Sequence, residues 1–138
     1  MKSVQKSAAQ GDVLFRKVAK VPTGFKLVAI EKSVGGNEEV VVSHSETGHH
    51  HVAASLSNGL EHFVAEGTDP EAALVCYLRM TSPLDEVRLD GLVSGIQVTH
   101  MRPYDTHEAL CLAGQPGDVW EVRRQREFAP EGWRRVQD

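Results

Sequence analysis

The chain of 138 residues contains 41% hydrophobic and 25% charged residues, the size and composition of one soluble globular domain able to bury a core. No apolar run approaches the ~20 residues of a membrane-spanning helix, and the N-terminus has no apolar segment typical of a secretory signal, so we expect a cytoplasmic protein without a membrane partner. The net charge of −4 is unevenly spread, because residues 31–122 carry fifteen acidic against four basic residues, and this acidic segment disfavours nucleic acid as a partner of the histidines within it.

The first residues of the chain differ in character from those that follow. Residues 1–10 are polar and are expected to form a flexible leader ahead of the folded domain. Runs of β-forming residues come next, and turns rich in Gly, Pro or Asn separate them. These runs predict strands at residues 13–18, 25–30, 40–42, 52–54 and 60–64.

The second half of the chain repeats this pattern, with one ambiguous segment. Residues 73–78 suit a buried strand, which we favour, although Asp69 and Pro70 before them could also start a helix. Residues 129–138 are expected to form a C-terminal tail with some helical character. Many short strands without a long helical period predict an all-β fold, a single small barrel or sandwich over residues 11–128. The further strands are expected at residues 87–93, 96–100, 109–112 and 119–122.

A run of three histidines, His49-His50-His51, lies between two predicted strands. Residues i and i+2 of a strand point to the same side, so His49 and His51 are expected to share one face while His50 points to the other. Imidazole is the commonest protein ligand for divalent transition metals. The spacing therefore predicts a metal-binding pair at His49 and His51, with surface histidines in a glycine-rich loop as the alternative.

Such a pair needs further ligands from elsewhere in the fold. His100 ends one predicted strand and His107 leads into the next, so either or both could complete the site at the mouth of a barrel. Three imidazoles and one open position form the arrangement of a catalytic metal ion, with zinc as the default and iron, manganese or nickel also open. Glu46 and Glu108 are the candidate catalytic carboxylates, or else partners that orient an imidazole ring.

These residues predict a metal-dependent enzyme that activates water for hydrolysis, carbonic-anhydrase-like hydration or lyase chemistry on a small-molecule substrate. The alternative is a non-catalytic binding or assembly module that the metal only stabilises, and a third hypothesis is an interaction protein whose histidines are incidental. A nucleophilic pair of Cys111 and His107 is disfavoured, because Cys111 lies in an apolar strand and a buried thiol is inert. Cys76 is likewise expected to be a small buried side chain. Self-association into a homo-oligomer is left open by the sequence.

Several motifs recur in a fixed order along the chain. They read G-D-V-L from Gly11, E-T-G-H-x-H from Glu46, the two later histidines, and V-R-R-Q-R-E-F-x-P from Val122, with R-R-V-x-D at the C-terminus. In this combination the chain resembles a family of small uncharacterised bacterial and phage-encoded β-rich proteins. The resemblance implies that the positions to watch are His49, His51 and His107, with His100 and Glu46 beside them, and that the protein is phage-associated. The chain departs from that family in a longer segment before His100 and in residues 101–106.

More loosely, a His-x-His motif followed by a distant histidine on a β-rich chain is similar to the pattern of cupins. This likeness implies a cupin-like architecture. Cupins carry a glutamate a few residues after His-x-His, whereas residues 52–56 of this chain contain none. The likeness therefore concerns architecture and assigns no function.

Overall fold

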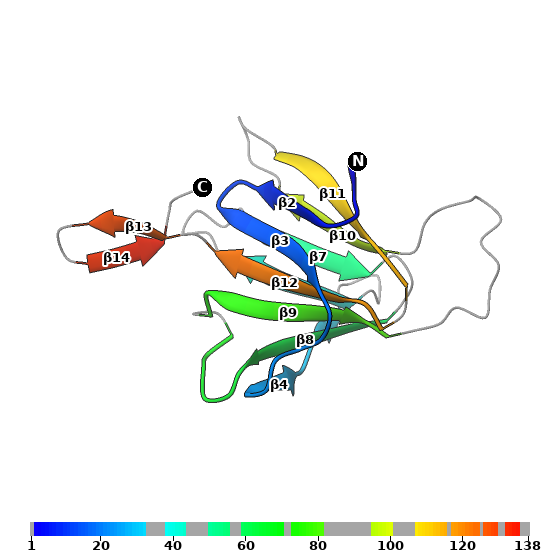
Figure 1. Cartoon of the computed structure of the whole chain (residues 1–138), viewed down its shortest axis with the longest axis horizontal. Helices are drawn as coiled ribbons and strands as arrows, with labels where there is room; N and C mark the ends of the chain where they lie inside the picture. The colour runs from blue at the N-terminus through cyan, green and yellow to red at the C-terminus, as the bar shows by residue number, and fades with distance from the viewer. Residues whose placement is uncertain are drawn as a thin grey trace.

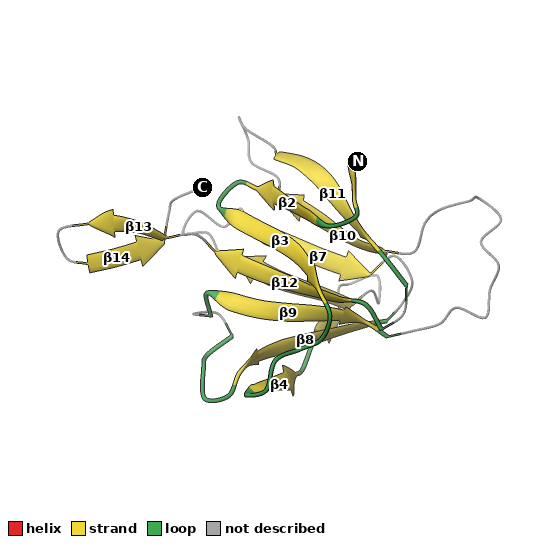
Figure 2. Ribbon diagram, viewed as in Figure 1, coloured by secondary structure: helices red, strands yellow, loops and turns green. Residues whose placement is uncertain are grey.

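The computed structural model describes residues 2–32, 38–43, 50–55, 59–70, 73–81, 95–100, 107–115, 117–124, 126–129 and 132–135. Two six-stranded sheets face each other, and a two-stranded ribbon follows near the C-terminus (Figures 1 and 2). Every regular element of the described residues is a strand, which confirms the predicted all-β class. The two sheets keep separate edges in this part of the chain, so the fold is a sandwich and not a closed barrel. No helix long and apolar enough to cross a membrane is found among the same residues.

The first sheet, sheet A, is antiparallel except at one edge, where β1 runs parallel to β11. Its central strands come from two distant parts of the chain, residues 38–55 and 95–113, so its register brings together residues far apart in sequence. In spatial order its strands are β1 (Lys2–Val4), β11 (His107–Ala113), β10 (Gly95–His100), β7 (His51–Ser55), β6 (Glu38–Ser43) and β5 (Glu31–Lys32).

The second sheet, sheet B, is antiparallel throughout. Its spatial order is β2 (Ser7–Gln10), β3 (Val13–Val18), β12 (Val119–Arg124), β9 (Val75–Met80), β8 (Leu60–Ala65) and β4 (Phe25–Val28). The ribbon pairs β13 (Arg126–Ala129) with β14 (Gly132–Arg135).

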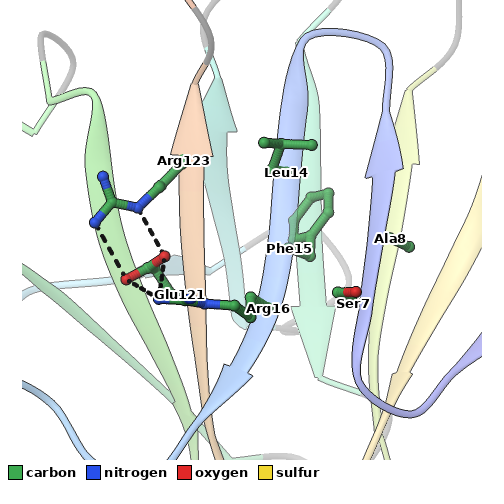
Figure 3. Close-up of a pocket in the computed structure, with 7 residues that line it drawn as sticks. All are labelled: Ser7, Ala8, Leu14, Phe15, Arg16, Glu121 and Arg123. Atoms are coloured by element: carbon green, nitrogen blue, oxygen red, sulfur yellow. Dashed lines mark hydrogen bonds and ion pairs between the residues drawn. The ribbon is translucent and has the colours of Figure 1, made fainter.

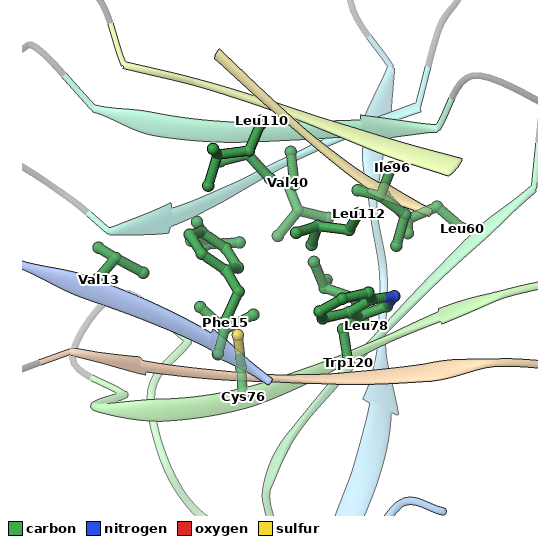
Figure 4. Close-up of a cluster of buried hydrophobic side chains, with 14 of the residues drawn as sticks. Val13, Phe15, Val40, Leu60, Cys76, Leu78, Ile96, Leu110, Leu112 and Trp120 are labelled. Atoms are coloured by element: carbon green, nitrogen blue, oxygen red, sulfur yellow. The ribbon is translucent and has the colours of Figure 1, made fainter. Parts of the chain in front are cut away.

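The core lies between the sheets and follows from the two-residue period of the strands. In β3, Val13 and Phe15 are buried while Leu14 is exposed, because alternate side chains face opposite sides of a sheet. Both cysteines are free and buried, as the sequence predicts. Large side chains from both sheets meet in this core (Figure 4): Phe15, Leu78 and Trp120 from sheet B, and Ile96, Leu110 and Leu112 from sheet A.

A second, smaller apolar cluster lies on the outer face of sheet B. Phe63, Tyr77 and Val119 form its buried part. Val18, Val21, Phe25 and Val75 pack against them. The side chains of Phe25 and Tyr77 meet edge to face, with ring centroids 4.8 Å apart. Sheet B is therefore partly covered on both faces.

Two segments differ from the structure predicted from the sequence, and a third settles an ambiguous prediction. Residues 2–10 are not a leader, because β1 and β2 belong to the two sheets and bury Val4 and Gln10. Their polar composition suits edge strands, where only one face is covered. Residues 132–135 form a strand where a partly helical tail is expected. β9 confirms the strand at the ambiguous segment, whereas the strand predicted at 87–93 lies outside the described residues.

Candidate functional site

Three histidines occupy one register row across sheet A. Ser43 of β6 pairs with His51 of β7, His51 pairs with His100 of β10, and His100 pairs with His107 of β11. Directly opposed residues of antiparallel strands are neighbours on the sheet. The register shifts beside this row in both β6–β7 and β10–β11, and such bulges are common next to functional sites.

His51 and His100 lie side by side in the interior. His51 is 0% exposed and His100 is 1% exposed. Their rings are stacked, with centroids 3.7 Å apart and planes 23° from parallel. Two imidazoles buried in contact are unusual in an apolar core, because each ring carries two polar nitrogens that must be satisfied.

The turn between β2 and β3 of sheet B supplies polar partners to His51. Gln10 and Val13 pair across this two-residue turn, and Gly11 enables it by adopting a φ of 59°. The Nδ1 atom of His51 lies 2.8 Å from Oε1 of Gln10, and its Nε2 atom lies 3.5 Å from Oδ1 of Asp12. Both Gln10 and Asp12 are 3% exposed, so the contacts are shielded from water.

The hydrogen bonds of Gln10 fix which nitrogen of His51 carries a proton. Nε2 of Gln10 donates to the carbonyl oxygen of Val98 at 3.1 Å, so the amide group has only one orientation. Its Oε1 atom therefore faces His51 and accepts a hydrogen bond from Nδ1–H. In the neutral ring this leaves the lone pair on Nε2, which faces the Asp12 carboxylate. A lone pair beside a carboxylate is repulsive unless a proton or a metal cation lies between them.

Arg124, on β12 of sheet B, lies at the same end of the sandwich. It occupies the sheet B row that runs from Gln10 through Val13, and it is 8% exposed. Its Nε atom donates to the carbonyl oxygen of Val42 in sheet A at 2.9 Å. Together with His51 and His100, the side chains of Gln10, Asp12 and Arg124 make this end of the core polar.

The charge of Arg124 reaches other buried groups. Burial, with Arg124 as a second cause, lowers the pKa of His62 on β8 from 6.5 to about 4. Burial raises the pKa of the Cys76 thiol to about 12, despite the opposing effect of Arg124. Burial also raises the pKa of Cys111. Neither thiol is thus a thiolate at neutral pH, consistent with the expectation that Cys111 is not a nucleophile.

The structure brings together two of the four predicted metal ligands at the level of side chains. His51 and His100 are in contact, and His107 stands opposite His100 in the backbone register, while the side chains of His107 and Glu108 lie outside the described residues. Glu46 and His49 belong to residues 44–49, which are also outside them. Within the described residues there is no group of three or more His, Cys, Asp or Glu side chains that could hold a metal ion.

Sequence reasoning missed the two polar residues that contact His51. Gln10 falls in the predicted leader, and Asp12 reads as an ordinary turn residue. The sequence feature that could have indicated them is the G-D dipeptide directly before a clear strand. A polar residue buried at such a turn needs a hydrogen-bond partner. Which partner it meets depends on how the two sheets face each other, and this is not written in a local pattern.

Comparison of the chain with protein-family models, with curated proteins and with solved structures finds no match in any of the three. The resemblance to small phage-encoded proteins therefore stays a prediction. The function has to be argued from the histidine row and from the residues that surround it.

Proposed function

We propose that the histidine row binds a divalent metal ion, zinc by default, and that the protein is a metal-dependent enzyme that activates water. The observation that carries the proposal is the row itself: His51 and His100 are buried in contact, and His107 is opposite His100 in the backbone register. His51 lies two residues after His49, at the spacing of a ligand pair on a strand. Since two described histidines are too few to hold the ion, His49 and His107 are proposed to supply the remaining ligands.

The environment of His51 supports this proposal. A metal-bound histidine usually donates its second ring N–H to a nearby oxygen, and Nδ1–H of His51 does so to Gln10. Its Nε2 atom is then the coordinating nitrogen. The 3.5 Å between this atom and Oδ1 of Asp12 is close to the separation of about 3.4 Å between two ligand atoms around a tetrahedral ion with bonds of about 2.1 Å. Asp12 is thus placed to join the ligands or to balance their charge.

A divalent ion held by imidazoles lowers the pKa of a bound water to about 7 and so supplies hydroxide at neutral pH. Glu46 and Glu108 are proposed to move protons between this water and the substrate, a small molecule that undergoes hydrolysis, hydration or lyase chemistry. Iron, manganese or nickel would suit the same imidazoles. We place the enzyme in the cytoplasm, with neither nucleic acid nor membrane as a partner.

The burial of the two histidines favours a second candidate. With His51 0% exposed and His100 1% exposed, an ion bound by their ring nitrogens would lie away from solvent, as structural ions do. In that case the metal would hold strands β7 and β10 of sheet A together, and the protein would be a non-catalytic binding or assembly module within a phage-encoded system.

Metal content measured on matched variants tests the proposal. Protein loaded with Zn²⁺ and dialysed is expected to retain about one zinc per chain by elemental analysis, the stoichiometry of a single site. His51→Ala and His100→Ala are expected to lose it, whereas His62→Leu, which alters a buried histidine outside the row, is expected to keep it. Circular dichroism confirms that each variant is folded. Full zinc retention in both row variants, or none in the unaltered protein, would refute the proposal.

Chelation separates the two candidate functions. If the site is catalytic, removal of zinc abolishes hydrolysis of a chromogenic ester or hydration of CO2 and changes the unfolding temperature little. If the site is structural, the same treatment lowers the unfolding temperature steeply, because the binding free energy of the ion is then part of the folding free energy.

A further inference from the structure

The outer face of sheet B carries a pocket that the histidine row does not explain. Its volume is about 470 Å³, within the range of small-molecule sites. Ser7, Leu14, Arg16, Glu121 and Arg123 contribute to its lining, from β2, β3 and β12 (Figure 3). Leu14 and Arg16 alternate along β3 with the core residues Val13 and Phe15, so the pocket opens on the side of the sheet away from the core.

A buried carboxylate organises this pocket. Glu121 is only 5% exposed, and it accepts hydrogen bonds from Nε of Arg123 at 2.7 Å and from the hydroxyl of Tyr77 at 2.9 Å. Nη2 of Arg16 lies 3.3 Å from its Oε1 atom. Arg16, Glu121 and Tyr77 are cross-strand neighbours on β3, β12 and β9, so the sheet itself fixes their spacing.

The carboxylate stays ionised at neutral pH. Burial alone would raise the pKa of Glu121, but hydrogen bonds from Arg123 and Tyr77, with the charges of Arg123 and Arg16, hold it below its ordinary value. The hydrogen bond that Arg123 donates to Glu121 also raises the pKa of Arg123. Glu121 therefore acts as a permanent anchor for both arginines.

Two guanidinium groups and one carboxylate leave this group with a charge of +1, although the whole chain carries −4. The side chains of Arg16 and Arg123 are 62% and 53% exposed, so each guanidinium also faces the solvent at the pocket. A guanidinium has five N–H donors, and Glu121 engages only Nε and Nη2 of Arg123 and Nη2 of Arg16. Further donors are thus held ready for a second anion.

An apolar side chain lies beside the two arginines. Leu14 is one of two large hydrophobic side chains that stand out as exposed among the described residues, at 39%. Figure 3 shows it on the same strand as Arg16, with the hydroxyl of Ser7 on the neighbouring strand. A ligand that fills this space therefore meets a cationic edge and an apolar wall.

We propose that this pocket binds a small carboxylate that bears an apolar chain, with its carboxylate on Arg16 and Arg123 and its chain against Leu14. A monoanion balances the charge of +1, whereas a phosphate dianion would leave excess negative charge beside the buried Glu121. The site is on the other face of sheet B from the histidine row, so this inference does not depend on the metal.

Titration of the ¹⁵N-labelled protein with hexanoate, followed by NMR, tests this assignment. Hexanoate is expected to shift the amide signals of β2, β3 and β12 in a saturable manner. Arg16→Gln and Arg123→Gln are each expected to weaken binding about tenfold, because each removes a charge-assisted hydrogen bond. Arg79→Gln is the matched control: Arg79 lies on the same face, is paired with Glu61 at 2.6 Å and does not line the pocket, so its loss is expected to leave binding unchanged.

Hexylamine and inorganic phosphate complete the experiment. Hexylamine, which has the same chain and the opposite charge, is expected not to shift the same signals, and phosphate is expected to bind more weakly than hexanoate. The proposal is overturned if hexanoate causes no saturable shift, if phosphate binds as tightly as hexanoate, or if Arg79→Gln weakens binding as much as the pocket variants do.

Discussion

Protonation of His62 is expected to cause much of the stability loss between pH 7 and pH 4. The side chain is 7% exposed and lies between the sheets on β8. Burial, and then the charge of Arg124, lowers its pKa from 6.5 to about 4. The folded protein therefore holds this ring neutral over a range of pH in which the unfolded chain protonates it.

The sign and size of the effect follow from the two pKa values. Between pH 6.5 and pH 4 the unfolded state binds a proton that the folded state does not, so stability falls as the pH falls. The difference between a pKa of 6.5 in the unfolded chain and about 4 in the folded protein corresponds to about 3 kcal/mol of unfolding free energy lost by pH 4. With a urea dependence of about 1–3 kcal/mol per molar, the urea midpoint would fall by about 1–3 M from this residue alone.

Urea unfolding at pH 7 and pH 4, followed by tryptophan fluorescence, measures the effect. In His62→Leu the pH dependence is expected to be smaller by about 3 kcal/mol, because leucine does not titrate. Val64→Ala is the control: Val64 is fully buried on the same strand, so its truncation should lower stability about equally at both pH values. Equal pH dependence in His62→Leu and the unaltered protein would show that His62 does not carry this proton linkage.

Three further predictions concern the polar contacts and the thiols. Gln10→Leu removes the acceptor for Nδ1–H of His51 and is expected to weaken Zn²⁺ binding about 10–100-fold in a competition assay, with unchanged affinity arguing against its positioning role. Burial, and then the hydrogen bond and charge of Glu121, raise the pKa of Tyr77. Glu121→Gln is therefore expected to lower this pKa in an ultraviolet titration of the phenol, and an unchanged midpoint would contradict the prediction. Cys76 is expected to react with a thiol reagent only after unfolding, since its pKa is about 12 in the folded protein, and rapid labelling of the native protein would contradict its burial.

Local patterns carry much of the fold. The alternation in Val13–Val18 and the apolar run at 73–78 predict strands, and the structure has strands at both places. Alternation is set by neighbouring residues, so it can be read without knowledge of the partners. The failure at residues 2–10 has the same cause, because edge strands with one covered face lack a strong apolar pattern.

The candidate site depends less on local sequence patterns. Its histidines can be selected from the sequence by residue type and by the two-residue spacing of His49 and His51, but the row of His51, His100 and His107 follows from the pairing of β7, β10 and β11. The contact of His51 with Gln10 depends further on how the two sheets face each other. Register and sheet packing are set by the whole core, so no single segment encodes them.

The outer pocket on sheet B also cannot be predicted from the sequence. In the sequence, Arg123 is one of several arginines in the motif that begins at Val122, and Glu121 is one of many acidic residues. Only the register places Arg16, Glu121 and Tyr77 in line across three strands. The structure thus adds a site that neither composition nor motif indicates.

Titration of the protein with Co²⁺ tests the central claim most directly, because a four-coordinate site gives this ion strong visible absorption bands that report both binding and ligand number. The metal-site account predicts bands that saturate at about one Co²⁺ per chain, that persist in His62→Leu, and that disappear in His51→Ala and His100→Ala. Bands of equal strength in His51→Ala, or no bands in the unaltered protein, would contradict the assignment of a metal ion to the histidine row.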